Sequence, residues 1–142
     1  MKKNYIYLII IIAIIAIISL VFYFFKTNPN KISIGTGNNQ VEISNILKDP
    51  IKTFPNSDVA YKRTDDYSFD YYAKDQLFII TITNPDIKNT RIKAENDFLK
   101  TLEITEDQAC KLNIQLGVPY SINPDASGIN YRLSFCPNGK PF

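Results

Sequence analysis

Histidine and tryptophan are absent from the 142-residue chain, which holds only two cysteines. Without histidine there is no Ser-His-Asp triad, no Cys-His dyad and no His-ligated zinc site. The remaining residues contain no motif that nominates a catalytic residue, a metal ligand or a cofactor. We therefore expect the protein not to be an enzyme and to carry neither cofactor nor metal.

The chain also lacks a strong excess of one charge. Its 16 Lys and Arg residues stand against 14 Asp and Glu, a formal net charge of +2. Lys2, Lys3 and Lys26 flank a long apolar run, so the 116 residues that follow this run carry a net charge of −1. Nucleic-acid-binding domains present clustered positive charge to the phosphates. Nucleic acid is therefore excluded as a partner.

What the chain does have is an uncharged run over residues 5–25. A helix of this length spans about 30 Å, the thickness of a bilayer core. Tyr5 and Tyr7 at one end and the aromatic residues 22–25 at the other match the belts found at membrane interfaces. The run is longer than the apolar part of a cleaved signal peptide, and no small-residue cleavage site follows it. We expect residues 1–26 to be an uncleaved signal anchor that crosses the membrane once.

The two cysteines, Cys110 and Cys136, suggest on which side of the membrane the remainder lies. An even count at wide spacing, outside any Cys-x-x-Cys, fits a structural disulfide and hence an oxidising compartment. Basic residues near the two ends of the apolar run are balanced and do not set the orientation. We expect the N-terminus inside and the C-terminal domain outside the cytoplasmic membrane. The alternative is a reactive thiol, which without histidine needs activation by Lys, Arg or a helix N-terminus.

Residues 27–60 have the composition of a flexible tether with only patchy structure. Asn-Pro-Asn at 28–30 ends the membrane helix, and the glycines within 35–39 add a second flexible point. Residues 41–47 are compatible with a strand or with one or two helical turns. As a coil, a tether of this length has an end-to-end distance of about 30 Å.

Residues 61–142 are predicted to form an extracytoplasmic α+β domain. Residues 67–72 and 77–83 have strand patterns, and the four residues between them fit a hairpin turn. Asn84 as N-cap, followed by proline, predicts a helix that ends near Leu102.

Two further strands complete this domain. A capping box at residues 105–108 predicts a short helix that ends near Cys110. Alternating apolar residues predict strands over 112–118 and 131–135. The predicted order is β-β-α-α-β-β, with the helices packed on one face of the sheet. A domain of about 80 residues has a small core and marginal stability, so a Cys110–Cys136 bridge would stabilise it substantially.

Two segments with one cysteine each carry a resemblance to known proteins. They are Ala-Cys-Lys-Leu at 109–112 and Leu-Ser-Phe-Cys-Pro at 133–137. Over residues 65–137 the chain resembles a group of uncharacterised, single-pass membrane-anchored proteins of candidate phyla radiation bacteria (Patescibacteria). The resemblance implies an extracytoplasmic domain in which Cys110 and Cys136 are paired. It implies no activity.

Two residues of the first predicted strand, Asp70 and Tyr72, are candidates for an interaction surface. Strand alternation places them on the face away from Phe69 and Tyr71, and exposed tyrosine is frequent in recognition surfaces. The acidic residues around the hairpin are otherwise expected to be solvated. Asn123, Asp125, Ser127 and Gly128 match part of a calcium loop, but the final glutamate is missing, so a plain turn is expected.

These features favour a membrane-tethered extracytoplasmic binding or accessory module of the cell envelope. Its expected partners are the membrane, through residues 5–25, and an envelope protein or wall component. One alternative is a pilin-like structural subunit, although the apolar segment lacks glutamate and a leader-processing motif. A histidine-free hydrolase that uses two carboxylates is the other alternative.

Overall fold

The computed structural model describes Tyr7, residues 12–19 and residues 29–142. Most of the predicted anchor over 1–26 lies outside these residues, although 12–19 are helical. Within the described part of the chain, no helix is both long enough and apolar enough to cross a membrane.

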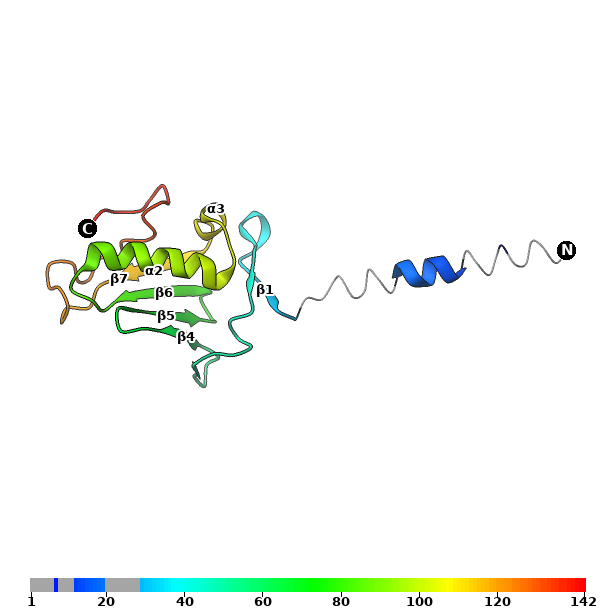
Figure 1. The fold of residues 1–142 in the computed structure, drawn as a ribbon, viewed down its shortest axis with the longest axis horizontal. Coiled ribbons are helices and arrows are strands. Elements are labelled where there is room, and N and C mark those ends of the chain that lie inside the picture. Colours follow the sequence, from blue (N-terminus) through cyan, green and yellow to red (C-terminus); the bar gives the residue numbers. More distant parts are fainter. Residues whose placement is uncertain (1–6, 8–11, 20–28) are drawn as a thin grey trace.

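Residues 29–142 form a mixed α+β fold with two sheets (Figure 1). A two-stranded antiparallel sheet pairs β1 with β2, and a five-stranded sheet has the order β3-β4-β5-β6-β7. β6 and β7 run parallel, and α2 lies in the crossover between them. The elements are β1 (Lys31–Ile34), the 3₁₀ turn η1 (Gly37–Asn39), β2 (Val41–Ser44), β3 (Lys52–Thr53), β4 (Val59–Arg63), β5 (Tyr67–Tyr72), β6 (Leu77–Ile82), α2 (Ile87–Leu102), α3 (Glu106–Ala109) and β7 (Asn113–Gly117).

The core lies between α2 and one face of the five-stranded sheet. Phe98 of α2 packs edge-on against Phe69 of β5 and Phe78 of β6, at ring-centroid distances of 5.5 and 5.6 Å. All three rings are fully buried. Edge-to-face aromatic pairs add about 0.5–1.5 kcal/mol beyond the area they bury. This cluster therefore fixes which face of β5 points inward.

The predicted hairpin is confirmed. β5 and β6 pair in register from Tyr67↔Ile82 to Tyr72↔Leu77. The turn between them contains no glycine, and Gln76 takes the positive φ of 47° that the chain reversal needs. Its side-chain Oε1 accepts a hydrogen bond from the Gly35 N–H at 2.8 Å. A long-range contact therefore holds a backbone conformation that costs energy for a residue other than glycine.

The predicted start of α3 is confirmed, and the predicted N-cap of α2 is wrong. Thr105 and Gln108 form the predicted capping box of α3. The N-cap of α2 is Asp86 and not Asn84, because the Asp86 carboxylate accepts from the Asn89 N–H. Asn84 instead accepts from the Asp86 N–H at 2.8 Å and so shapes the turn before the helix.

The prediction that residues 27–60 form a flexible tether is wrong for residues 31–60. β1 and β2 form a hairpin in which Val41 and Ile43 join the hydrophobic core. Lys31 of β1 forms an ion pair with Glu103 after α2, which lowers the pKa of Glu103. The predicted boundary at residue 61 falls inside β4, because residues 52–60 supply two strands of the main sheet.

The predicted last strand over 131–135 is not a strand. Tyr131 and Leu133 are buried, as their alternation indicates, but Arg132 between them has a positive φ of 55°. The segment contains turns, and its carbonyls bond to a side chain of α2 instead of a neighbouring strand. Within residues 29–142, the observed order therefore places six strands before α2 and α3 and one after them, in place of the predicted β-β-α-α-β-β.

A tyrosine at the start of β5 gives the domain an alkaline pH dependence. The Tyr67 hydroxyl donates to Asp97 of α2 at 3.0 Å, and Lys62 pairs with the same carboxylate at 3.2 Å. Partial burial, followed by this hydrogen bond and the negative charge of Asp97, raises the pKa of Tyr67 from 10.0 to about 12. The unfolded chain therefore loses the Tyr67 proton at lower pH than the folded chain does.

We expect the stability that Tyr67 contributes to be complete below pH 10 and to be lost as the pH rises towards 12. Tyr67→Phe should lower stability by about 1 kcal/mol at pH 8 and flatten the fall between pH 10 and 12. Urea unfolding at closely spaced pH values measures both effects. Tyr120→Phe, at a side chain 72% exposed, is the matched control and should leave the pH curve unchanged. A Tyr67→Phe curve parallel to that of the parent chain would contradict the expectation.

Candidate functional site

A pocket of about 550 Å³ lies between the loop that joins β3 to β4 and one end of β5. Its lining includes both residues that the sequence nominated for an interaction surface, Asp70 and Tyr72. Asp70 pairs across the sheet with Ala60 of β4, on the face away from the Phe69–Phe98 contact. The structure therefore brings Asp70 and Tyr72 together with a segment that the sequence analysis assigned to the tether.

The loop over residues 54–58 is held in shape by its own polar groups. The Phe54 N–H donates to the Asp58 carbonyl at 2.9 Å, and the Ser57 N–H donates to the Phe54 carbonyl at 3.0 Å. Ser57 has a positive φ of 68°. The buried Asp58 carboxylate accepts from the Asn56 amide and, at 2.8 Å, from the Ala73 N–H of the β5–β6 turn. These bonds fix the loop against the sheet.

An ion pair lies at the side of the pocket formed by the sheet. Arg63 Nη2 donates to Asp70 Oδ1 at 2.5 Å. Arg63 Nη1 donates to the carbonyls of Lys62 and Phe69, at 2.9 and 3.2 Å. The guanidinium is therefore oriented by backbone acceptors as well as by the carboxylate. Such a held group presents fixed donors to a ligand.

The rim of the pocket is aromatic. Phe54 and Tyr72 are 37% and 41% exposed, although both line the pocket. Lys52 Nζ lies 4.8 Å from the Phe54 ring centroid, so the electron-rich face of this ring attracts a cation. Exposed aromatic side chains beside a few fixed polar groups are typical of binding sites.

The two carboxylates of the pocket bear on the hydrolase alternative. Asp58 accepts hydrogen bonds at both oxygens, and Asp70 is paired with Arg63. Donors within the domain therefore already engage both carboxylates.

The other acidic residues of the hairpin region do not form a cluster with Asp70. Asp66 accepts from the Asn84 side chain at 2.6 Å, and the Asp75 carbonyl accepts from Asn113 at 3.3 Å. Across the described residues, no group of three or more His, Cys, Asp or Glu side chains could hold a metal ion. At the loop with the partial calcium pattern, Asn123 Oδ1 accepts from the Ala126 N–H at 3.1 Å, which makes it a turn.

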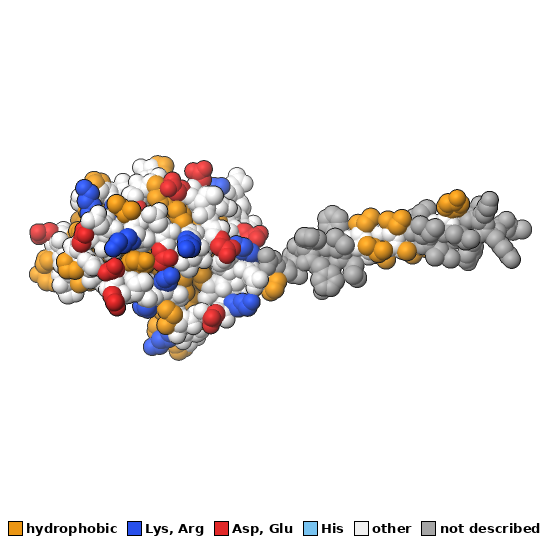
Figure 2. All heavy atoms as spheres, in the orientation of Figure 1, with side chains coloured by type: hydrophobic (Ala, Val, Ile, Leu, Met, Phe, Trp, Pro, Cys, Tyr) orange, Lys and Arg blue, Asp and Glu red, His pale blue; other side chains and the backbone are white. Residues whose placement is uncertain are grey.

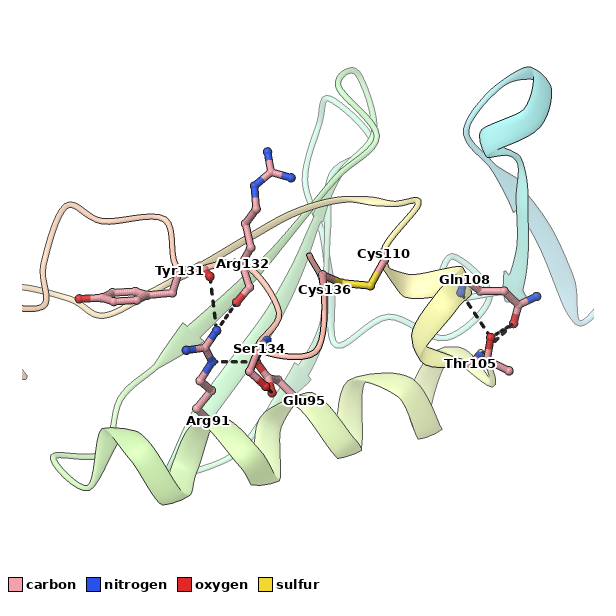
Figure 3. Close-up of a disulfide and its surroundings, with 9 residues drawn as sticks. All are labelled: Arg91, Glu95, Thr105, Gln108, Cys110, Tyr131, Arg132, Ser134 and Cys136. Atoms are coloured by element: carbon pink, nitrogen blue, oxygen red, sulfur yellow. Dashed lines mark hydrogen bonds and ion pairs between the residues drawn. A yellow bond between two sulfur atoms is a disulfide. The ribbon is translucent and has the colours of Figure 1, made fainter. Parts of the chain in front are cut away.

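The predicted disulfide between Cys110 and Cys136 is confirmed, with 26 residues of separation (Figure 3). It joins the end of α3 to the C-terminal segment, defined here as residues 131–142. Arg91 and Glu95, both 4% exposed, hold the same segment from α2. Both residues lie on the buried side of α2, and the sequence predicted no role for this pair.

Arg91 and Glu95 together satisfy several groups of the C-terminal segment (Figure 3). The Arg91 side chain donates to Glu95 at 2.7 Å and to the carbonyls of Arg132 and Lys140, at 2.8 and 2.6 Å. The Glu95 carboxylate accepts from the N–H and the hydroxyl of Ser134. The spacing of four residues on the buried side of a helix was the signal for a buried ion pair.

Comparison of the chain with protein-family models, with curated proteins and with solved structures finds no significant match.

Proposed function

We propose that the chain is a single-pass, membrane-anchored binding module whose domain lies outside the cytoplasmic membrane. In this proposal the protein is not an enzyme, and it binds an envelope protein or a wall component. The observation that carries the proposal is the pocket, because its exposed aromatic rim and its fixed Arg63–Asp70 pair form a recognition surface. The visible face of the domain mixes positive and negative side chains without a large patch of one sign (Figure 2).

The membrane anchor is supported by the exposed apolar surface of residues 12–19. Five isoleucines of this helical segment are between 50% and 62% exposed (Figure 2). Water-exposed apolar surface on this scale needs a membrane or a protein to cover it. The uncharged sequence around it, over 5–25, is long enough to span a bilayer.

The distance between anchor and domain makes the proposal more specific. The apolar run closes at Lys26, and the first strand begins at Lys31. Four residues between them span at most about 14 Å when fully extended. The proposed module therefore works close to the membrane surface, unlike a domain on the 34-residue tether that the sequence suggested.

The proposed location rests on the disulfide. Disulfides persist in oxidising compartments and are rare in the cytosol. The bridge joins the end of α3 to the C-terminal segment, so it closes the loop over residues 110–136.

Labelling of intact cells with a membrane-impermeant maleimide tests the location. In the parent chain we expect label only after reduction, since both cysteines are paired. A Tyr120→Cys variant places a third thiol at an exposed position and should label from outside without reductant. The parent chain without reductant is its matched control. Labelling of the variant only after lysis would place the domain inside and overturn the proposal.

A further inference from the structure

We propose that the pocket between the β3–β4 loop and β5 binds a neutral saccharide chain. This inference rests on the proposed function, in which the same pocket is the recognition surface, and it names the ligand class.

The aromatic rim suits the apolar face of a sugar ring. Phe54 and Tyr72 keep more than a third of their surface exposed at the same pocket. An aromatic face is electron-rich, and the axial C–H groups of a pyranose carry partial positive charge.

The charged groups of the lining are Asp58, Arg63 and Asp70, and each is already engaged within the domain. Arg63 and Asp70 compensate each other, and the Asp58 carboxylate is satisfied by Asn56 and Ala73. A charged ligand would compete with these partners for the same groups. The hydroxyl groups of a sugar need not displace these partners, because an ionised carboxylate accepts up to about four hydrogen bonds. Asp70 receives one of them from Arg63.

The loop is fixed before any ligand arrives. The hydrogen bonds of Asn56, Ser57 and Asp58 set the position of Phe54 relative to the sheet. Tyr72 is set by its place in β5, paired with Leu77. A pre-formed site loses little conformational entropy on binding. Its volume of about 550 Å³ lies within the range of about 300–1,000 Å³ that is usual for small-ligand sites.

A peptide that adds a strand to the sheet fits this side of the domain less well. β3, the edge strand next to the pocket, has only two residues, Lys52 and Thr53. Strand addition needs a longer row of free backbone groups, and an edge lysine blocks it. The sugar is therefore the ligand that the geometry favours over an extended peptide.

Binding is tested with the full chain in phosphatidylcholine nanodiscs, because glycoside detergents would compete for the pocket. The probes are N-acetylchitotetraose, cellotetraose and maltotetraose, with tetralysine and tetraglutamate as charged peptides. Ligand-observed NMR and calorimetry measure the affinity. We expect at least one tetrasaccharide to bind with a Kd of about 0.1–1 mM, the range of a weak specific contact, and neither peptide to bind.

Variants of the rim identify the pocket as the place of binding. Tyr72→Ala should raise the Kd at least tenfold, and Tyr72→Phe should restore most of the affinity because it keeps the ring. Tyr120→Ala, at an exposed tyrosine outside the pocket, is the matched control and should leave the Kd unchanged. A thermal unfolding curve for each variant verifies that it is folded.

Three outcomes would overturn the inference. The first is that the folded chain binds no saccharide at a saccharide concentration 5-fold above the upper expected Kd. The second is that Tyr72→Ala leaves saccharide binding intact. The third is that a charged peptide binds and that Tyr72→Ala abolishes its binding. The last would leave the proposed binding module in place with a different ligand. The maleimide experiment decides the location of the domain independently of all three.

Discussion

Replacement of Arg91 by methionine is expected to lower the free energy of unfolding by about 3–5 kcal/mol. The loss arises because the Glu95 carboxylate would stay buried without its positive partner. The carbonyls of Arg132 and Lys140 would lose their donor as well. Breaking one side of a buried pair costs far more than the pair contributes, since the remaining charge cannot reach water.

Urea unfolding followed by circular dichroism measures this loss. Arg132→Met is the matched control, because Arg132 is an exposed arginine of the C-terminal segment, and it should change stability by less than about 0.5 kcal/mol. Adding Glu95→Gln to Arg91→Met should recover part of the loss, since the amide is neutral and keeps an acceptor for the Ser134 N–H. Equal effects at Arg91 and Arg132 would show that the buried charge is not the cause.

The sequence predicted those elements whose signals are local. The β5–β6 hairpin, the capping box at Thr105 and the alternation of β7 each depend on residues within one short segment. Strand alternation also separated Asp70 and Tyr72 from the inward-facing side chains of β5. Local propensity and burial pattern agree in these elements, so a single sequence suffices.

The elements that the sequence missed depend on distant contacts. Val41 and Ile43 form a strand because they pair with β1 and pack into the shared core, and no local pattern records that partner. The alternation at Tyr131 and Leu133 was genuine burial, but only the Tyr131 N–H bonds to β7, at the Leu116 carbonyl, while the carbonyls of Tyr131 and Arg132 accept from Arg91. The same cause hid the Phe54 side of the pocket, since the hydrogen bond from the Ala73 N–H to Asp58 fixes the loop against the sheet.

Removal of the disulfide is the second prediction with a large effect. Cys110→Ala together with Cys136→Ala should lower the free energy of unfolding by about 3.5 kcal/mol, the loop-entropy value for a separation of 26 residues. The total free energy of unfolding of a small domain is about 5–15 kcal/mol. We therefore expect the variant to stay folded at 25 °C in low salt but to unfold at a much lower temperature.

The bridge and Arg91 hold the same C-terminal segment. When the bridge is removed, protection against amide exchange should therefore be lost first in this segment. When the bridge is absent, residues 131–142 lose their covalent link to the end of α3 and are held to α2 by the hydrogen bonds of Arg91 and Glu95. Hydrogen bonds open more readily than a covalent bond, so amide exchange should rise most in this segment and in the turn after α3, and least in β5 and β6 at the centre of the sheet. Dithiothreitol should reproduce the effect in the parent chain and have none in the double variant, which is the control for the reagent. Uniform loss of protection across β5, β6 and the C-terminal segment would contradict local opening of this segment and would leave an effect on the unfolded chain alone.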